Sequence, residues 1–186
     1  YAVVTYHTAW LKAYHCSAFM AATMSSDLDN TDTIKIFYED TIANRIAVLP
    51  PDVNQSDYRF VPTDAKTIRY GLGAVKGVGE PAVRAILAAR DSGGPFKDLF
   101  DFCCRVDKRL ANRRVIEALV RAGAFDALDP VQPADRHKLL ASVGIAMEAA
   151  EQIAANAMQG GLFDIPGEVS APMVDYVKVR PWGERE

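Results

Sequence analysis

Two glycines, Gly77 and Gly79, stand on either side of Val78 and form the arrangement in this sequence best suited to binding chemistry. Glycines at this spacing let the backbone turn sharply and approach a ligand with no Cβ in the way. Pro81 suits the first turn of a following helix, where its missing N–H costs nothing. The amides at a helix N-terminus lack intrahelical acceptors, and a phosphate suits that position. The sequence therefore predicts an anion site made of backbone amides.

Apolar residues at helical spacing flank this turn on both sides. We expect a helix over 72–76 and another over 80–90, the latter with Val83, Ile86 and Leu87 on one face. Helix, glycine hairpin and helix in this order are similar to the helix-hairpin-helix pattern of proteins that hold a nucleic-acid backbone without reading its sequence. A second, degenerate copy with a single glycine is expected at 122–125.

The charge distribution agrees with a phosphate-binding surface. Residues 66–121 hold 12 basic and 6 acidic residues, a net charge of +6, whereas the rest of the chain holds 9 basic and 18 acidic residues. A basic excess around the hairpin is what contact with nucleic acid requires. The alternative is a solvated basic face with no ligand, formed by Arg105, Lys108, Arg109, Arg113 and Arg114.

Composition indicates an ordinary globular protein of one domain or two small ones. The chain has 186 residues, of which 49% are hydrophobic and 24% charged. No apolar run approaches the roughly 20 residues of a membrane span, and no signal-peptide pattern is present, so we expect no membrane partner and a cytoplasmic location. The first residue is Tyr1, without a Met, and the last is Glu186, so we expect an excised piece of a longer protein.

Cysteines and histidines do not suggest catalysis. Cys16, Cys103 and Cys104 make neither a disulfide framework nor a zinc site, and we interpret the adjacent pair as small buried hydrophobic side chains. The acidic turn over 27–32 lacks the glycine and the closing glutamate of a calcium loop. No catalytic residue and no metal ligand are expected, and the histidines to which we assign no role are His7, His15 and His137.

The predicted fold class is mainly α. Helices are expected over 1–25, 31–45, 98–104, 112–121 and 133–158, in addition to those at the hairpin. Tyr6, Trp10 and Tyr14 form a stripe that we assign to the core. A short β-hairpin is expected over 57–70. The consecutive prolines at 50 and 51 exclude a helix in the segment before it, 49–56. Apolar residues of the last helix alternate three and four apart, which suits one neighbouring helix.

Taken in order, these segments resemble the alpha (catalytic) subunits of bacterial replicative DNA polymerases, family C, and the resemblance covers almost the whole chain. The stretches that carry it are 6–13, 19–22, 25–32, 49–56, 71–80, 112–119 and 122–126. The family often has Tyr-Pro where this chain has His15 and Cys16, and a more basic stretch near 42–45.

The resemblance also implies a domain organisation. Residues 1–48 would be the C-terminal part of a fingers domain, and residues 49–130 a tandem helix-hairpin-helix domain. Residues 131–158 would form a long helix. Residues 159–186 would contain a peptide that binds the sliding clamp and a linker toward an OB-fold that this chain lacks.

The resemblance implies that the parent polymerase synthesises DNA and that carboxylates of its palm domain hold the divalent metal (Mg²⁺). That palm is missing here and no acid matches its catalytic aspartates, so we expect no polymerase activity from this segment alone. Its expected role is to hold double-stranded DNA behind the active site, with a monovalent cation at the hairpin carbonyls. The expected DNA-binding residues are Lys76, Gly77, Val78, Gly79, Arg84, Arg113 and Arg114.

A second partner is implied by the peptide Gln159–Phe163. It resembles the Gln-x-x-Leu-Phe peptide with which bacterial polymerases hold the sliding clamp (beta subunit). Leu162 and Phe163 would fill an apolar pocket, and Gln159 would hydrogen-bond at its rim. The alternative is that both apolar residues pack against their own domain. Other replicase subunits would be partners through the full-length protein.

Three alternative functions remain open from the sequence. One is the error-prone translesion paralogue of the same family. Another is a helix-hairpin-helix module of a DNA repair nuclease or helicase, against which the motif at 49–56 and the fingers-like start count. The third is a structural module whose glycine hairpin packs internally and never meets DNA.

Overall fold

Helices dominate the part of the chain that the structure, a computed structural model, describes, which is residues 1–128, 136–159 and 176–177. This confirms the predicted class. The α-helices are α1 (Ala2–Tyr14), α2 (Cys16–Ser26), α3 (Thr31–Ala43), α4 (Glu80–Gly93), α5 (Leu99–Arg105), α6 (Arg113–Ala122) and α7 (Arg136–Gln159). The strands are β1 (Ala47–Leu49), β2 (Val61–Asp64) and β3 (Thr67–Arg69), and Leu72–Ala74 forms a 3₁₀ turn, η1.

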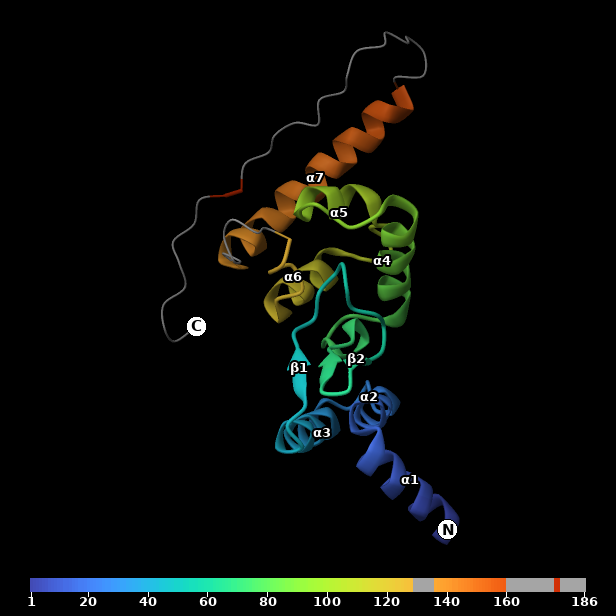
Figure 1. Cartoon of the computed structure of the whole chain (residues 1–186). Helices are drawn as coiled ribbons and strands as arrows, with labels where there is room; N and C mark the ends of the chain where they lie inside the picture. The colour runs from blue at the N-terminus through green and yellow to red at the C-terminus, as the bar shows by residue number, and fades with distance from the viewer. Residues whose placement is uncertain (129–135, 160–175, 178–186) are drawn as a thin grey trace.

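The three strands form a small sheet between α2–α3 and the group α4 to α7 (Figure 1). The strand order is β1-β3-β2, in which β2 and β3 are antiparallel and β1 is parallel to β3. The β2–β3 pair confirms the hairpin predicted over 57–70. Strand β1 was not predicted, because three residues that pair with a strand about twenty positions later leave no local pattern. Met20, Met24, Ile34 and Ile68 form the core under this sheet.

The N-terminal helix differs from its prediction in two ways. His15 (φ −133°, ψ 49°) breaks the predicted single helix into α1 and α2. The stripe assigned to the core is exposed, and α1 has no buried residue; the prediction for Tyr6, Trp10 and Tyr14 was wrong. The Trp10 ring instead lies 5.1 Å from that of Tyr14, and Lys12 forms an ion pair with Asp40 of α3. Helical spacing alone does not tell a buried stripe from side chains that pack on one another.

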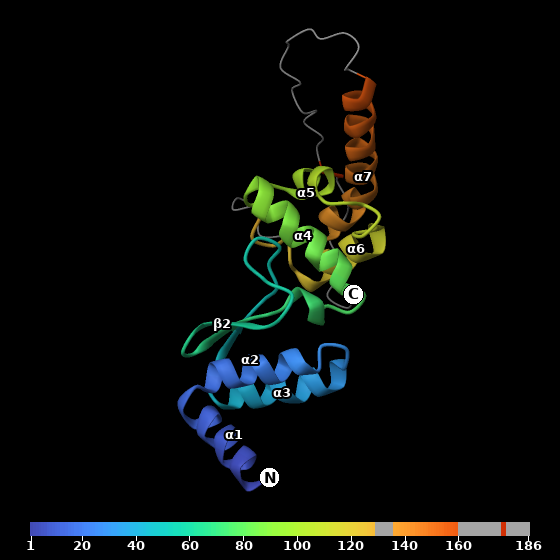
Figure 2. The same cartoon turned by 90° about the vertical axis from the view of Figure 1, so that its right-hand side faces the viewer.

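A second and larger core lies among α4, α5, α6 and α7. Leu99 and Phe102 of α5, Ile86 of α4 and Leu119 of α6 are fully buried in it. Figure 2 shows α7 running past α5 and α6 and extending beyond them. The apolar seam of α7 therefore packs against two helices, whereas the sequence predicted one neighbour.

The motif at 49–56 joins the sheet to this helical core. The Asn54 side chain makes two hydrogen bonds to the Phe96 backbone, donating to its carbonyl (2.9 Å) and accepting from its amide (2.7 Å). The Val53 amide donates to the Ala124 carbonyl, and Arg90 of α4 donates to the Ser56 carbonyl (2.8 Å). This segment, one of those that carry the family resemblance, therefore connects the sheet to the helical core.

The adjacent cysteines Cys103 and Cys104 lie on different faces of α5. Cys103 is 2% exposed, and burial raises the pKa of its thiol to about 12, so it is an inert core residue as predicted. Cys104 is exposed, and its prediction as a buried residue was wrong, because neighbours on a helix point about 100° apart. Among the described residues, no three His, Cys, Asp or Glu side chains gather closely enough to hold a metal ion. No helix in these residues is long and apolar enough to span a membrane.

Candidate nucleic-acid interface

The glycine hairpin is built from a tighter element than predicted. Leu72–Ala74 forms a single 3₁₀ turn in place of the α-helix expected over 72–76. The Val78 amide then donates to the Val75 carbonyl (3.0 Å), and Gly77 adopts φ +90°, a conformation that side-chain-bearing residues rarely adopt. Val78 is 6% exposed and belongs to the helical core. The apolar residue between the glycines therefore anchors the turn while both glycines stay at the surface.

Four amides around the two glycines have no hydrogen-bond partner among the described residues. Those of Lys76, Gly77, Gly79 and Glu80 donate to no group in that part of the chain, and all four residues are exposed. Gly79 is the N-cap of α4 and supplies no capping side chain. By contrast, the side chains of Asp98 and Asn112 accept from amides at the starts of α5 and α6. The start of α4 thus retains the free donors and the positive end of the helix dipole, both of which suit an anion.

Close backbone packing fixes the position of this hairpin. The amides of Leu72 and Gly73 donate to the carbonyls of Asp57 (2.8 Å) and Tyr58 (2.9 Å). A Cβ on Gly73 would lie 2.5 Å from the Tyr58 ring, so a glycine is needed for this approach. The loop that enters the hairpin is therefore bonded directly to the segment that leads into β2.

The predicted charges around the hairpin differ in their surroundings. Lys76 is exposed and has no ion-pair partner among the described residues. Arg84 lies one turn into α4 and is paired with Glu80, whose carboxylate is 2.6 Å from Nη2. This pair is neutral as a whole, so Arg84 would have to exchange Glu80 for a phosphate in order to act as a DNA contact.

Helix α6 lies beside the hairpin, and its first two residues, Arg113 and Arg114, lie on different faces of the helix. A Cβ on Gly77 would lie 3.9 Å from that of Ala118, which places this residue of α6 against the turn. Arg114 lies four residues before Ala118 and Arg121 three residues after it, on the same helix face. Arg113 instead packs toward α7, where its guanidinium would lie 3.6 Å from a Cβ on Gly144. Of the predicted basic residues on the hairpin side, Lys76 and Arg114 are therefore the two that form no ion pair among the described residues.

Arg121 is a candidate that the sequence analysis missed. Its side chain is 61% exposed, and its nearest charged partner is Glu117, at 3.8 Å. Arg121 lies three residues after Ala118, on the same face of α6. The sequence could have indicated this only if the contact between Ala118 and the hairpin had been known.

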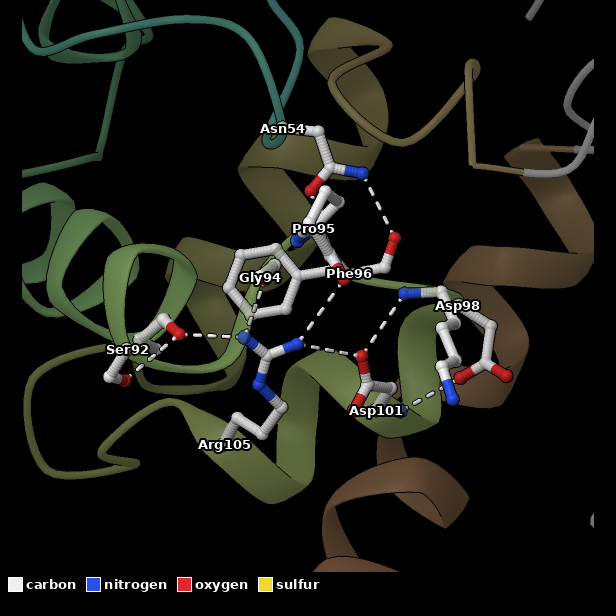
Figure 3. A network of polar contacts seen from close by, with 10 residues as sticks. Asn54, Ser92, Gly94, Pro95, Phe96, Asp98, Asp101 and Arg105 are labelled. Atoms are coloured by element: carbon white, nitrogen blue, oxygen red, sulfur yellow. Dashed lines mark hydrogen bonds and ion pairs between the residues drawn. The ribbon is translucent and has the colours of Figure 1, made fainter.

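Two other basic residues of the 105–114 stretch are used inside the protein. The Arg105 guanidinium donates to the carbonyls of Ala89 and Gly94, each at 2.6 Å, and pairs with Asp101 (Figure 3). It also lies 4.6 Å from the centre of the Phe96 ring. Lys108 donates to a carbonyl of α7. Exposed Arg109 is bonded to Asp107, which lowers the pKa of that carboxyl. The idea of one continuous solvated basic face was therefore wrong at Arg105 and Lys108.

The second, degenerate hairpin serves packing. Gly123 ends α6 in the left-handed conformation (φ +83°), and its amide and those of Ala124 and Asp126 donate to backbone carbonyls. Arg136 of α7 covers this turn and makes a bidentate ion pair with Asp126, which raises the pKa of the guanidinium. These amides are not available to a ligand as those of the first hairpin are.

Comparison with known proteins agrees with this architecture. A family model described as "Helix-hairpin-helix motif" matches residues 45–139. Over its whole length the chain is 55% identical to DNA polymerase III subunit alpha of Neisseria meningitidis serogroup B. It is 44% identical to that of Vibrio cholerae and 42% identical to that of Escherichia coli K12. The chain spans 16% of the length of each of these relatives. It therefore belongs to the helix-hairpin-helix family and is homologous, from end to end, to one segment of bacterial DNA polymerase III alpha subunits.

Proposed function

We propose that this segment holds the phosphate backbone of double-stranded DNA for a replicative polymerase, without reading base sequence. The observation that carries the proposal is the group of solvent-facing amides of Gly77, Gly79 and Glu80 at the start of α4. Lys76 and Arg114 add charge beside them, and neither has an ion-pair partner among the described residues. Backbone amides and exposed cations recognise phosphate oxygens, which are the same for every base pair.

The structural-module alternative explains the second hairpin better than the first. At the second hairpin the amides and Gly123 are used by the fold and covered by Arg136. At Gly79 an added Cβ would meet only the Pro81 ring, at 3.6 Å, so packing does not require a glycine there. A glycine that packing does not need, next to exposed amides, favours the approach of a ligand.

Duplex affinity of the purified chain, measured at several salt concentrations, tests this function. Two duplexes of equal length and unrelated sequence should bind with the same dissociation constant. If about three phosphates are neutralised, log K should fall with log salt with a slope of about −2.7, since each neutralised phosphate contributes about −0.9. A strong preference for one duplex, or an affinity that does not depend on salt, would contradict the proposal.

The relatives' name supports a wider role in bacterial DNA replication, in the cytoplasm, as part of a polymerase that carries the catalytic carboxylates elsewhere. The 42–55% identity to replicative subunits favours this form over the error-prone paralogue and over a repair module. We also propose that the hairpin carbonyls hold a monovalent cation that bridges to phosphate. The carbonyls of Lys76, Gly77 and Val78 accept no hydrogen bond within the described part of the chain.

We also propose that the peptide Gln159–Phe163 binds the sliding clamp. Gln159 is the last residue of α7, so the peptide begins where this helix ends, beyond α5 and α6 (Figure 2). Leu162 and Phe163 lie outside the residues that the structure describes. A tether to the clamp would raise the effective concentration of DNA at the hairpin without adding a DNA contact, and so support processive synthesis together with the other replicase subunits.

A further inference from the structure

Glu117 on α6 forms ion pairs with two arginines, Arg113 on the α7 side and Arg121 on the helix face of Ala118. Its Oε1 is 2.8 Å from Arg113 Nε, and its Oε2 is 3.8 Å from Arg121 Nη2. The Glu117 side chain is 21% exposed, whereas the two arginines are 64% and 61% exposed. Ala118, the next residue, is the one that lies against Gly77. A carboxylate is therefore paired with a cationic group, Arg121, on the face of α6 that lies against the hairpin.

A carboxylate and a phosphate diester compete for the same guanidinium donors, because both accept its N–H groups through oxygens of similar geometry. Exposed pairs four residues apart on a helix are weak, about 0.3–0.5 kcal/mol each, so an incoming phosphate can replace the carboxylate. The two arginines differ in position. Arg113 packs toward Gly144 of α7, whereas Arg121 lies on the helix face of Ala118, toward the hairpin. Of the two, Arg121 has the longer and weaker contact with Glu117.

We propose that Glu117 is an internal competitor of DNA phosphate: it binds Arg121 in the free protein and releases it to a phosphate diester that reaches the Gly77–Gly79 amides. This inference rests on the proposed function. Arg121 is then a further DNA contact, and Glu117 keeps Arg113 as its partner on the α7 side. The carboxylate lowers affinity for duplex DNA and makes the free surface less cationic.

A double-mutant cycle with Glu117→Gln and Arg121→Ala in the full chain tests this inference, with duplex affinity as the readout. Glu117→Gln should tighten binding about threefold and steepen the salt slope by about one. Arg121→Ala should weaken binding about twofold in the wild-type background and about fivefold in the Glu117→Gln background, where Arg121 is committed to phosphate.

The opposite pattern would overturn the inference. If Arg121 only neutralises Glu117 and never touches DNA, Arg121→Ala weakens binding in the wild type, because it uncovers the carboxylate, and has no effect once Glu117 is Gln. Arg114→Ala is the matched control, since Arg114 has no ion pair within the described part and its loss should be equal in both backgrounds.

Glu39→Gln is the control for the general effect of charge, because Glu39 is an exposed residue of α3 and forms no ion pair among the described residues. It changes net charge by the same amount and should leave affinity within about 1.5-fold of the wild type. If Glu117→Gln behaves like Glu39→Gln while the wild type binds duplex, this inference fails alone. If the wild type does not bind duplex, the proposed function fails and the inference fails with it.

Discussion

Replacing Arg105 with methionine is expected to lower the free energy of unfolding by about 3 kcal/mol, since the change removes several charge-assisted hydrogen bonds at once. The wild-type guanidinium donates to the carbonyls of Ala89, Gly94 and Pro95 and pairs with Asp101. These groups join the end of α4, the loop after it and α5, and the Arg105 side chain is only 21% exposed. Methionine keeps most of the apolar stem but leaves the three carbonyls without this donor.

Urea denaturation followed by circular dichroism measures this loss. Arg109→Met is the matched control, because Arg109 is 90% exposed and bonded only to nearby Asp107, and its effect should stay within about 0.5 kcal/mol. Where both variants are folded, their duplex affinity should agree within about twofold. An Arg105→Met protein as stable as the wild type, but clearly weaker in duplex binding, would instead make Arg105 a phosphate contact.

Changing Leu162 and Phe163 together to alanine should reduce affinity for a sliding clamp by about a hundredfold or more. Burying each large apolar side chain contributes about 1.5–3 kcal/mol, and every 1.4 kcal/mol is a factor of ten in affinity. The clamp of Neisseria meningitidis is a suitable probe, since a polymerase subunit of that organism is 55% identical to this chain. Calorimetry with the full chain gives the affinity directly.

The control for this experiment changes Met173 and Val174 to alanine, which removes two apolar side chains from the same C-terminal stretch. This variant should bind the clamp like the wild type. Equal weakening by both double variants would show a non-specific apolar contact. Full clamp binding by the Leu162 and Phe163 variant would place the clamp contact elsewhere in the chain. The affinity for duplex DNA should be unchanged in both double variants.

Local signals in the sequence predicted the elements that local chemistry controls. Asp98 and Asn112 were placed at the starts of two helices, and in the structure their side chains cap α5 and α6. The β-hairpin over 57–70 and the glycine turn were likewise found from residues close in the chain. Such features depend on the conformational preferences of a few adjacent residues.

Features that depend on tertiary packing could not be predicted in this way. Arg105 and Arg114 look alike in the sequence, yet Arg105 donates to three backbone carbonyls while Arg114 stays exposed. The proximity of Ala118 to Gly77 joins positions forty-one residues apart and decides which arginines lie beside the hairpin. The aromatic stripe of α1 had core-like spacing but is exposed, because no described element covers it.

The most direct test of the central claim, that the Gly77–Gly79 hairpin holds DNA phosphate, is the duplex affinity of Gly79→Val. Gly79 has an ordinary extended conformation (φ −83°, ψ 159°), and an added Cβ would make only an ordinary contact with the Pro81 ring, at 3.6 Å. The variant should therefore fold, with a loss of about 1 kcal/mol because valine is a poorer N-cap residue than glycine. Its side chain would cover the amides, and affinity should fall about tenfold, as expected when charge-assisted hydrogen bonds are lost. Ala22→Val, on the exposed surface of α2, should bind like the wild type. A folded Gly79→Val protein that also binds like the wild type would contradict the account.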